Sequence, residues 1–343
     1  MTPDETTPGG PLPPPNHELQ ADGTTPPPQE DLPSLPSRMI GALFSPGATF
    51  RRISGRPVWT GALAAYLVIV AVATLTYSLK VDWESMLRGQ LESSLGWKIT
   101  SSFLPENQLD QAEHAMMSEV LSIGRNGMAL NSVLNSVIGT TLVFQIMLIL
   151  FATLFYLMGS LADLKLGRIY LDGLLAILIF ILFAILNAVV RGIFGGDSLA
   201  ALPYQAGLAS IFFIGYFWFL RRSIERQPDF KRLAATYAHA MAVPALAMLV
   251  LMVVVVIKSG AVTAPADQVV QSSIAGMLSM KGAGPLTVML GALDIFTLWG
   301  LVVAAIGFAS ATRLSLGASI AITFLPWGFY TMARIAIAAA FGG

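Results

Sequence analysis

An aspartate lies in an almost wholly apolar stretch near the C-terminal end of the sequence, GALDIFTLWGLVVAAIGFASATRL, residues 291–314. A charged side chain near the middle of a bilayer costs at least about 2.5 kcal/mol on insertion scales, so it usually faces the bundle interior and binds a partner. Arg334 lies at a comparable depth in the next apolar stretch, and we predict that it pairs with Asp294. Thr297 would share a helix face with Asp294, and Tyr330 would share one with Arg334.

Two other roles for Asp294 stay open. If the helix starts later than the apolar stretch does, Asp294 would be an N-cap in the outer interface, where the helix dipole favours an acid. Alternatively, Asp294 would be a proton or cation site in a transporter, since intramembrane acids also mark ion pathways.

A second group of charged residues lies in the segment RRSIERQPDFKR, residues 221–232, which contains five basic and two acidic residues. The basic residues are Arg221, Arg222, Arg226, Lys231 and Arg232. At a membrane surface each basic residue contributes about 1 kcal/mol of attraction to anionic lipid. We predict that this segment contacts anionic lipid or an acidic partner, with the alternative that its charges only set the membrane topology.

Other residue types that support catalysis or metal binding are sparse. The sequence has no cysteine, and its three histidines, His17, His114 and His239, are far apart in the chain. Sequence motifs of hydrolases, metalloproteases, P-loop proteins and dinucleotide-binding proteins are absent. We therefore expect no enzymatic activity, no catalytic or metal-binding residues, no cofactor and no nucleic-acid partner.

The composition is that of a membrane protein. Hydrophobic residues make up 55% of the chain and charged residues only 12%, against about 25% charged in soluble domains. Residues 1–37 differ, because they hold six acids, no lysine or arginine, and eleven of the twenty prolines. We expect a disordered cytoplasmic tail there, which is either a solvated tether or a segment that docks into a proline-recognition groove.

The remainder, residues 38–343, is expected to form one all-α polytopic transmembrane bundle. A spanning helix needs about 20 mostly apolar residues, and seven stretches qualify, of which the fourth is the shortest. They are Val58 to Leu79, Ser132 to Met158, Gly173 to Phe194, Pro203 to Leu220, Ala234 to Ile257, Leu286 to Ala309 and Leu316 to Phe341. Residues 80–131 are predicted to form an outer helical segment, and residues 258–285 a loop with one short helix.

Proline positions and charge distribution add detail to this bundle. Ser45 and Pro46 predict the start of a surface helix before the first span, while Pro244 and Pro326 predict kinks within the fifth and seventh spans. Such kinks either shape helix packing or line a substrate path. A cytoplasmic N-terminus and an outer C-terminus place twelve of the twenty basic residues in short inner segments, as the positive-inside rule requires.

Four segments together resemble bacterial members of the Yip family, the membrane proteins with a Ypt-interacting-protein domain. They are LFSPGATFRRISGRPVW, VDWESMLRGQLE, FKRLAATYAHAMAVPALAMLV and LDIFTLWGLVVAAIGFASATRLSLG. The resemblance implies a five-span core with a cytoplasmic N-terminus, so the third and fourth spans would be an inserted hairpin. It also implies a location in the bacterial inner membrane and no catalytic residues. The aspartate-leucine-tyrosine-glycine-proline signature of the GTPase-linked eukaryotic branch is missing, so GTPase binding is not carried over.

The functional expectation from these observations is a membrane scaffold or adaptor. Its partners would be the lipid bilayer, anionic lipids in particular, and a membrane or cytoplasmic protein bound through the cytoplasmic basic face. The alternative is a transporter of a small solute or ion that uses Asp294 and the proline-containing spans.

Overall fold

The structure is a computed structural model that describes residues 32–86, 105, 108, 111, 114, 118, 124–161, 163–193, 202–263, 269–280, 284–312 and 314–341. Contacts divide the chain into Met1–Leu32 and Pro33–Gly343, and the description below concerns the second unit. Most of the expected tail and most of the expected outer segment at 80–131 lie outside the described residues.

Helices make up the regular structure of the described residues, together with two isolated β-bridges. Five helical stretches within these residues are long and apolar enough to cross a membrane. They are α3 (Thr60–Lys80), α7 (Gly124–Leu157), α8 (Leu166–Ile193), the pair α10 (Pro228–Ala240) and α11 (Ala242–Ile257), and α16 (Leu316–Phe341). The expectation of a membrane-embedded helix bundle is confirmed, whereas the number of seven spans stays a prediction.

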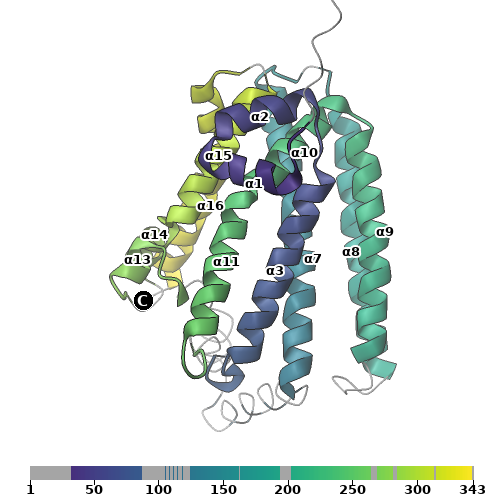
Figure 1. Ribbon diagram of the computed structural model, residues 1–343. Coiled ribbons are helices and arrows are strands. Elements are labelled where there is room, and N and C mark those ends of the chain that lie inside the picture. Colours follow the sequence, from purple (N-terminus) through teal and green to yellow (C-terminus); the bar gives the residue numbers. More distant parts are fainter. Residues whose placement is uncertain are drawn as a thin grey trace, which may run out of the picture. The chain divides into compact units, whose positions relative to one another are not determined.

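The fourth predicted span corresponds to α9 (Leu202–Glu225), which runs beside α8 as the second arm of a hairpin (Figure 1). Aromatic rings join the two arms: the centroids of Phe183 and Phe212 are 4.4 Å apart, and those of Phe180 and Tyr216 are 4.8 Å apart. Helix α9 has 24 residues, which is long enough to cross a bilayer, but it is less apolar than α8.

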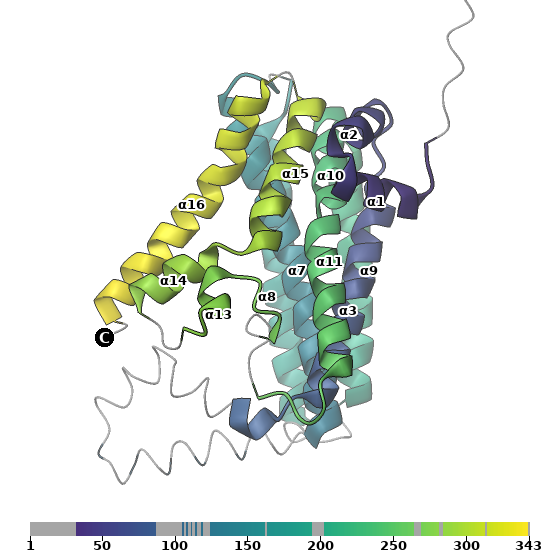
Figure 2. The same cartoon turned by 60° about the vertical axis from the view of Figure 1, so that its left-hand side comes forward.

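The sixth predicted span is not one helix, which corrects the sequence prediction. It consists of α14 (Pro285–Ala292) and α15 (Ile295–Ala311), and the chain between them is extended at Asp294 (Figure 2). The backbone there pairs with an earlier segment, because the Ile274 N–H donates to the Leu293 carbonyl (3.3 Å) and the Ile295 N–H donates to the Ser272 carbonyl (3.2 Å). These hydrogen bonds replace helical ones at the break.

The segment that pairs with this break contains a short helix, α13 (Ile274–Met277). A loop with one short helix was expected between residues 258 and 285, and α13 fits that expectation. Because α15 has 17 residues, it is about 25 Å long and does not cross a hydrocarbon core of about 30 Å by itself. A crossing at this place would need α14 as well.

The two predicted proline positions differ in their local structure. Helix α10 ends at Ala240 and α11 begins at Ala242, so the interruption falls where Pro244 has no N–H to offer the Ala240 carbonyl. Pro326, in contrast, lies inside α16, which continues past it to Phe341.

From residue 32 onward, where the description starts, two short helices precede the first span: α1 (Leu35–Phe44) and α2 (Pro46–Gly55). Helix α2 begins at Pro46 as predicted, although the Ser45 side chain makes no cap hydrogen bond. Helix α1 begins at Leu35, three residues earlier than the boundary expected at residue 38, because Pro36 suits the first turn of a helix. The expected tail boundary therefore moves back to residue 34.

Helix α2 packs against α15 and α10 through fully buried Phe50 and Ile53. Gly307 on α15 permits this contact, because a Cβ there would lie 3.1 Å from the Phe50 ring and 2.6 Å from the Thr236 methyl group. The segment before the first span is thus part of the folded bundle.

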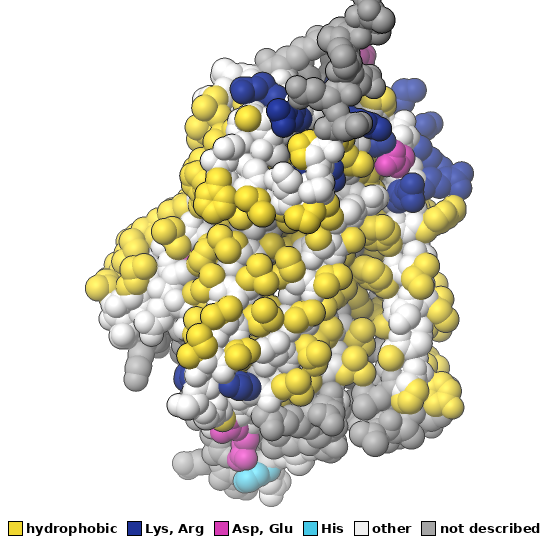
Figure 3. All heavy atoms as spheres, in the orientation of Figure 1, with side chains coloured by type: hydrophobic (Ala, Val, Ile, Leu, Met, Phe, Trp, Pro, Cys, Tyr) yellow, Lys and Arg dark blue, Asp and Glu magenta, His cyan; other side chains and the backbone are white. Residues whose placement is uncertain are grey.

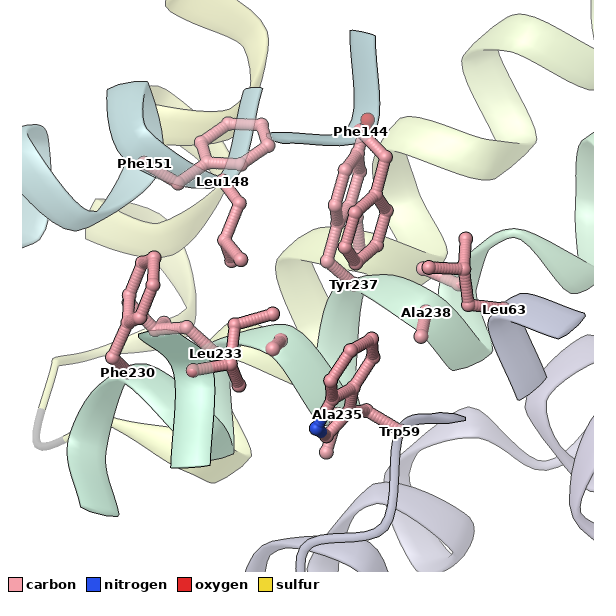
Figure 4. Packing of buried hydrophobic residues seen from close by; sticks show 14 of the residues in the cluster. Trp59, Leu63, Phe144, Leu148, Phe151, Phe230, Leu233, Ala235, Tyr237 and Ala238 are labelled. Carbon is pink, nitrogen blue, oxygen red and sulfur yellow. The ribbon is translucent and has the colours of Figure 1, made fainter. Parts of the chain in front are cut away.

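The main apolar core lies where α3, α7, α10 and α15 meet (Figure 4). Tyr237 of α10 stacks on Phe144 at 5.2 Å and meets the edge of Phe151 at 5.5 Å. Phe308 of α15 continues this aromatic group, 4.9 Å from Phe151. Trp59, at the start of α3, is also fully buried in this cluster.

Away from this core, a broad band of the surface is apolar (Figure 3). Along α8 the exposed side chains include Leu171, Leu174, Leu178, Ile181 and Ile185. Soluble proteins rarely leave so large an apolar area in water. The band therefore fits contact with lipid chains, and it agrees with a membrane-embedded protein.

Candidate functional site

Asp294 is the N-cap of α15. Its Oδ1 atom accepts a hydrogen bond from the Thr297 backbone N–H at 2.8 Å, and its Oδ2 atom accepts one from the Ser272 hydroxyl. Both carboxylate oxygens are therefore occupied by groups of the same chain. The negative charge also stabilises the positive end of the α15 dipole.

The predicted pair of Asp294 and Arg334 is not formed in the described residues. Arg334 is exposed on α16, and its guanidinium carbon lies 5.7 Å from the centre of the Tyr330 ring. The prediction assumed an unbroken helix through Asp294, and the break between α14 and α15 removes that assumption. The N-cap alternative describes the observed geometry, with the Thr297 backbone rather than a shared side-chain face as the contact.

An open pocket of about 510 Å³ lies beside this break. Its walls come from α13 and α15 and include Ile274, Met277, Ile295 and Trp299. Ser272 is the polar lining residue, and its hydroxyl is already bound to Asp294. The pocket thus resembles an apolar groove more than a catalytic centre.

The basic residues of the described chain gather mainly at the end of the bundle that carries α1, α2 and the connection between α9 and α10 (Figure 3). Two of the five predicted contact residues are neutralised there by acids of the same segment. Lys231 lies 2.5 Å from Glu225, and Arg232 lies 3.3 Å from Asp229. Glu225 also accepts a hydrogen bond from the Trp59 indole at 3.2 Å, which ties the segment to the start of α3.

The other three predicted contact residues, Arg221, Arg222 and Arg226, are exposed. No carboxylate pairs with them in the part of the chain that the structure describes. The guanidinium of Arg222 lies 5.5 Å from the centre of the Trp218 ring, which is within cation–π range. The uncompensated charge of this segment is therefore concentrated at its N-terminal half.

Sequence reasoning missed a buried polar contact inside the α8–α9 hairpin. The Ser223 hydroxyl donates to the Asp172 carboxylate at 2.6 Å, and both side chains are buried. Asp172 precedes the predicted third span by one residue, whereas α8 begins at Leu166 and includes it. The signal in the sequence was an acid directly followed by an apolar run, but its partner lies 51 residues away.

A second missed contact joins α1 to α10. The Arg38 Nε atom donates to His239 Nε2 at 3.3 Å, and one of its terminal nitrogens donates to the Pro33 carbonyl at 2.7 Å. His239 is fully buried, and its Nδ1 atom lies 2.8 Å from the Ala235 carbonyl, so the proton is assigned to Nδ1. Burial lowers the pKa of the Arg38 guanidinium.

No protein-family model, curated protein or solved structure matches this chain. Membership of the Yip family accordingly stays a prediction from the four sequence segments. Among the residues that the structure describes, no three His, Asp or Glu side chains come together as a metal site would require.

Proposed function

We propose that the protein is a membrane scaffold or adaptor that binds partners through its basic face. The observation that carries the proposal is the cluster of Arg221, Arg222 and Arg226, exposed and without acidic partners among the described residues, next to the apolar band. Charges in this arrangement attract acidic groups at a membrane surface. A folded cap of α1 and α2 lies at the same end and adds Arg51 and Arg56 to this face.

The same charges support a cytoplasmic location for this end of the bundle. The proposal also includes seven crossings of the cell membrane. Basic residues are retained on the cytoplasmic side during insertion. Helix α16 runs away from the end that carries α1 and α2 and stops part-way toward the opposite end (Figure 1), which is the direction that a C-terminus on the outer side requires. A bacterial inner membrane and an inserted α8–α9 hairpin are further parts of the proposal, and they rest on the resemblance to the Yip family.

Transport of a small solute or ion is a second candidate function. It is favoured by the two interrupted helices, α10 with α11 and α14 with α15, because transporter binding sites are often built from broken helices. The hydrogen bonds of Asp294 to Thr297 and Ser272 weigh against it, since they leave the carboxylate engaged within the chain.

Purification of the full chain after cross-linking in cells tests the scaffold proposal. We expect a protein partner that is recovered with the native chain and with Lys231→Gln/Arg232→Gln, but at least about threefold less with Arg221→Gln/Arg222→Gln/Arg226→Gln. Equal recovery with the triple variant would contradict the proposal. Uptake of ions or small solutes into liposomes containing the purified protein, abolished by Asp294→Asn, would support the transporter instead.

A further inference from the structure

Three acids near the α8–α9 hairpin, Glu225, Asp229 and Asp172, are engaged by neighbours. Glu225 binds Lys231 and Trp59, Asp229 binds Arg232, and Asp172 binds Ser223. Arg221, Arg222 and Arg226 form no ion pair among the described residues, so we take their positive charge as available to an external anion.

Helix α8 brings further positive charge to the same place. Two contacts hold its first turns beside the end of α9: Asp172 with Ser223 at 2.6 Å, and the Lys165 N–H with the Gln227 side-chain oxygen at 2.9 Å. Arg168 lies one turn before Asp172 on the same face of α8, and Arg226 lies about one turn beyond Ser223. Both arginines are exposed. They lie at the end of the hairpin where α8 begins and α9 ends.

One face of α9 continues from these charges into the apolar band. Ile211, Ile214, Trp218 and Arg222 follow one another at spacings of three or four residues, which places them in one row along the helix. The two isoleucines are 73% and 69% exposed, and Trp218 is 61% exposed. The row thus runs from apolar side chains through an interfacial tryptophan to a guanidinium, an order that matches the membrane from acyl chain to headgroup.

We propose that this row is a binding site for an anionic phospholipid. The phosphate would lie between Arg222 and Arg226, with Arg168 across the hairpin, and an acyl chain would follow Ile211 and Ile214. Arginine suits this role because its guanidinium donates two parallel hydrogen bonds to phosphate. An acidic soluble protein would contact the guanidinium groups alone, whereas a phospholipid would contact both the arginines and the apolar row that leads to them.

The inference rests on the proposed function, since it uses the same basic face, and it names the ligand.

Phosphatidylglycerol and phosphatidylcholine are suitable probes because both carry a phosphate but only the first is anionic. The delipidated full chain in non-ionic detergent would be titrated with each lipid, and bound lipid would be counted by native mass spectrometry. Size-exclusion chromatography and thermal unfolding would establish that each variant is folded.

The matched variants are Arg222→Gln/Arg226→Gln and Lys231→Gln/Arg232→Gln, which remove the same number of charges from the same segment. We expect tighter binding of phosphatidylglycerol than of phosphatidylcholine. The first variant should weaken phosphatidylglycerol binding by roughly 10- to 30-fold, from about a fivefold loss per charge, and the second by less than about threefold. Trp218→Ala should also weaken it.

Equal loss in both charge variants would overturn the site, because general positive charge would then explain the binding. Unchanged binding in the first variant would also overturn it. Inorganic phosphate would also be added as a competitor of bound phosphatidylglycerol. If it displaces this lipid as readily as additional phosphatidylglycerol does, a soluble phosphate is the ligand instead. If lipid binding is unaffected while the cross-linked protein partner is lost, the lipid site fails and the scaffold proposal stands.

Discussion

At the scale of single residues, Asp294 shows how an acid within an apolar stretch can be satisfied without a basic partner. Its oxygens accept hydrogen bonds from the Thr297 N–H and the Ser272 hydroxyl. The exposed Arg334 lies beside Tyr330 and is a separate feature. The stability contribution of Asp294 should therefore come from helix capping and not from an ion pair.

Replacement of Asp294 by alanine should destabilise the protein by about 1 kcal/mol, because α15 would lose its N-cap. Asp294→Asn should retain most of the stability, since asparagine is also a good N-cap, and Arg334→Gln should change it by less than about 0.5 kcal/mol. Denaturant unfolding of the purified protein in detergent measures all three. If Arg334→Asp restores the stability that Asp294→Arg removes, the predicted ion pair of Asp294 and Arg334 would be supported instead.

At the scale of the elements, the α8–α9 hairpin depends on a few specific contacts. Most of the α8 surface is exposed, so the aromatic pairs and the contact of Asp172 with Ser223 hold it to α9. A buried carboxylate that loses its hydrogen-bond donor leaves an expensive unsatisfied group.

Ser223→Ala should therefore lower the free energy of unfolding by about 1–3 kcal/mol. Ser210→Ala is a matched control in the same helix, because the Ser210 residue is exposed and its hydroxyl donates to the Ala206 carbonyl one turn earlier. It should change the stability by less than about 0.5 kcal/mol. Thermal unfolding of both variants in the same detergent compares them, and equal effects would rule out a special role for the Asp172 contact.

At the scale of the whole molecule, the uneven distribution of arginines between the two ends of the bundle determines the proposed orientation in the membrane. The end with α1, α2 and the α9–α10 connection carries most of the described arginines. The opposite end of the bundle includes the turn after α11, where Ser259 is exposed.

The native chain has no cysteine, so single cysteines at Gly55 and Ser259 can be labelled without background. Both residues are exposed, and Gly55 has open space around a new Cβ. A membrane-impermeant maleimide should label Ser259→Cys in intact cells and Gly55→Cys only after permeabilisation. The reverse pattern would mean that the basic face lies outside.

Much of the architecture could be predicted from the order of residues alone. Apolar runs of about 20 residues specify membrane helices because the bilayer core has a fixed thickness. Pro46 marks the start of α2, since proline suits the first position of a helix. The cluster of arginines at the C-terminal end of α9 is equally visible in the sequence, since it needs no knowledge of the fold.

The tertiary structure decided which of these residues are engaged. Asp294 became a helix cap because the backbone beside it pairs with residues near Ser272, a contact between segments about 20 residues apart. Asp172 found its partner in Ser223 only because α8 and α9 lie side by side. Hydropathy and helical periodicity describe one segment at a time. They cannot specify contacts between segments, and these contacts determine which charges are paired and which are left for a ligand.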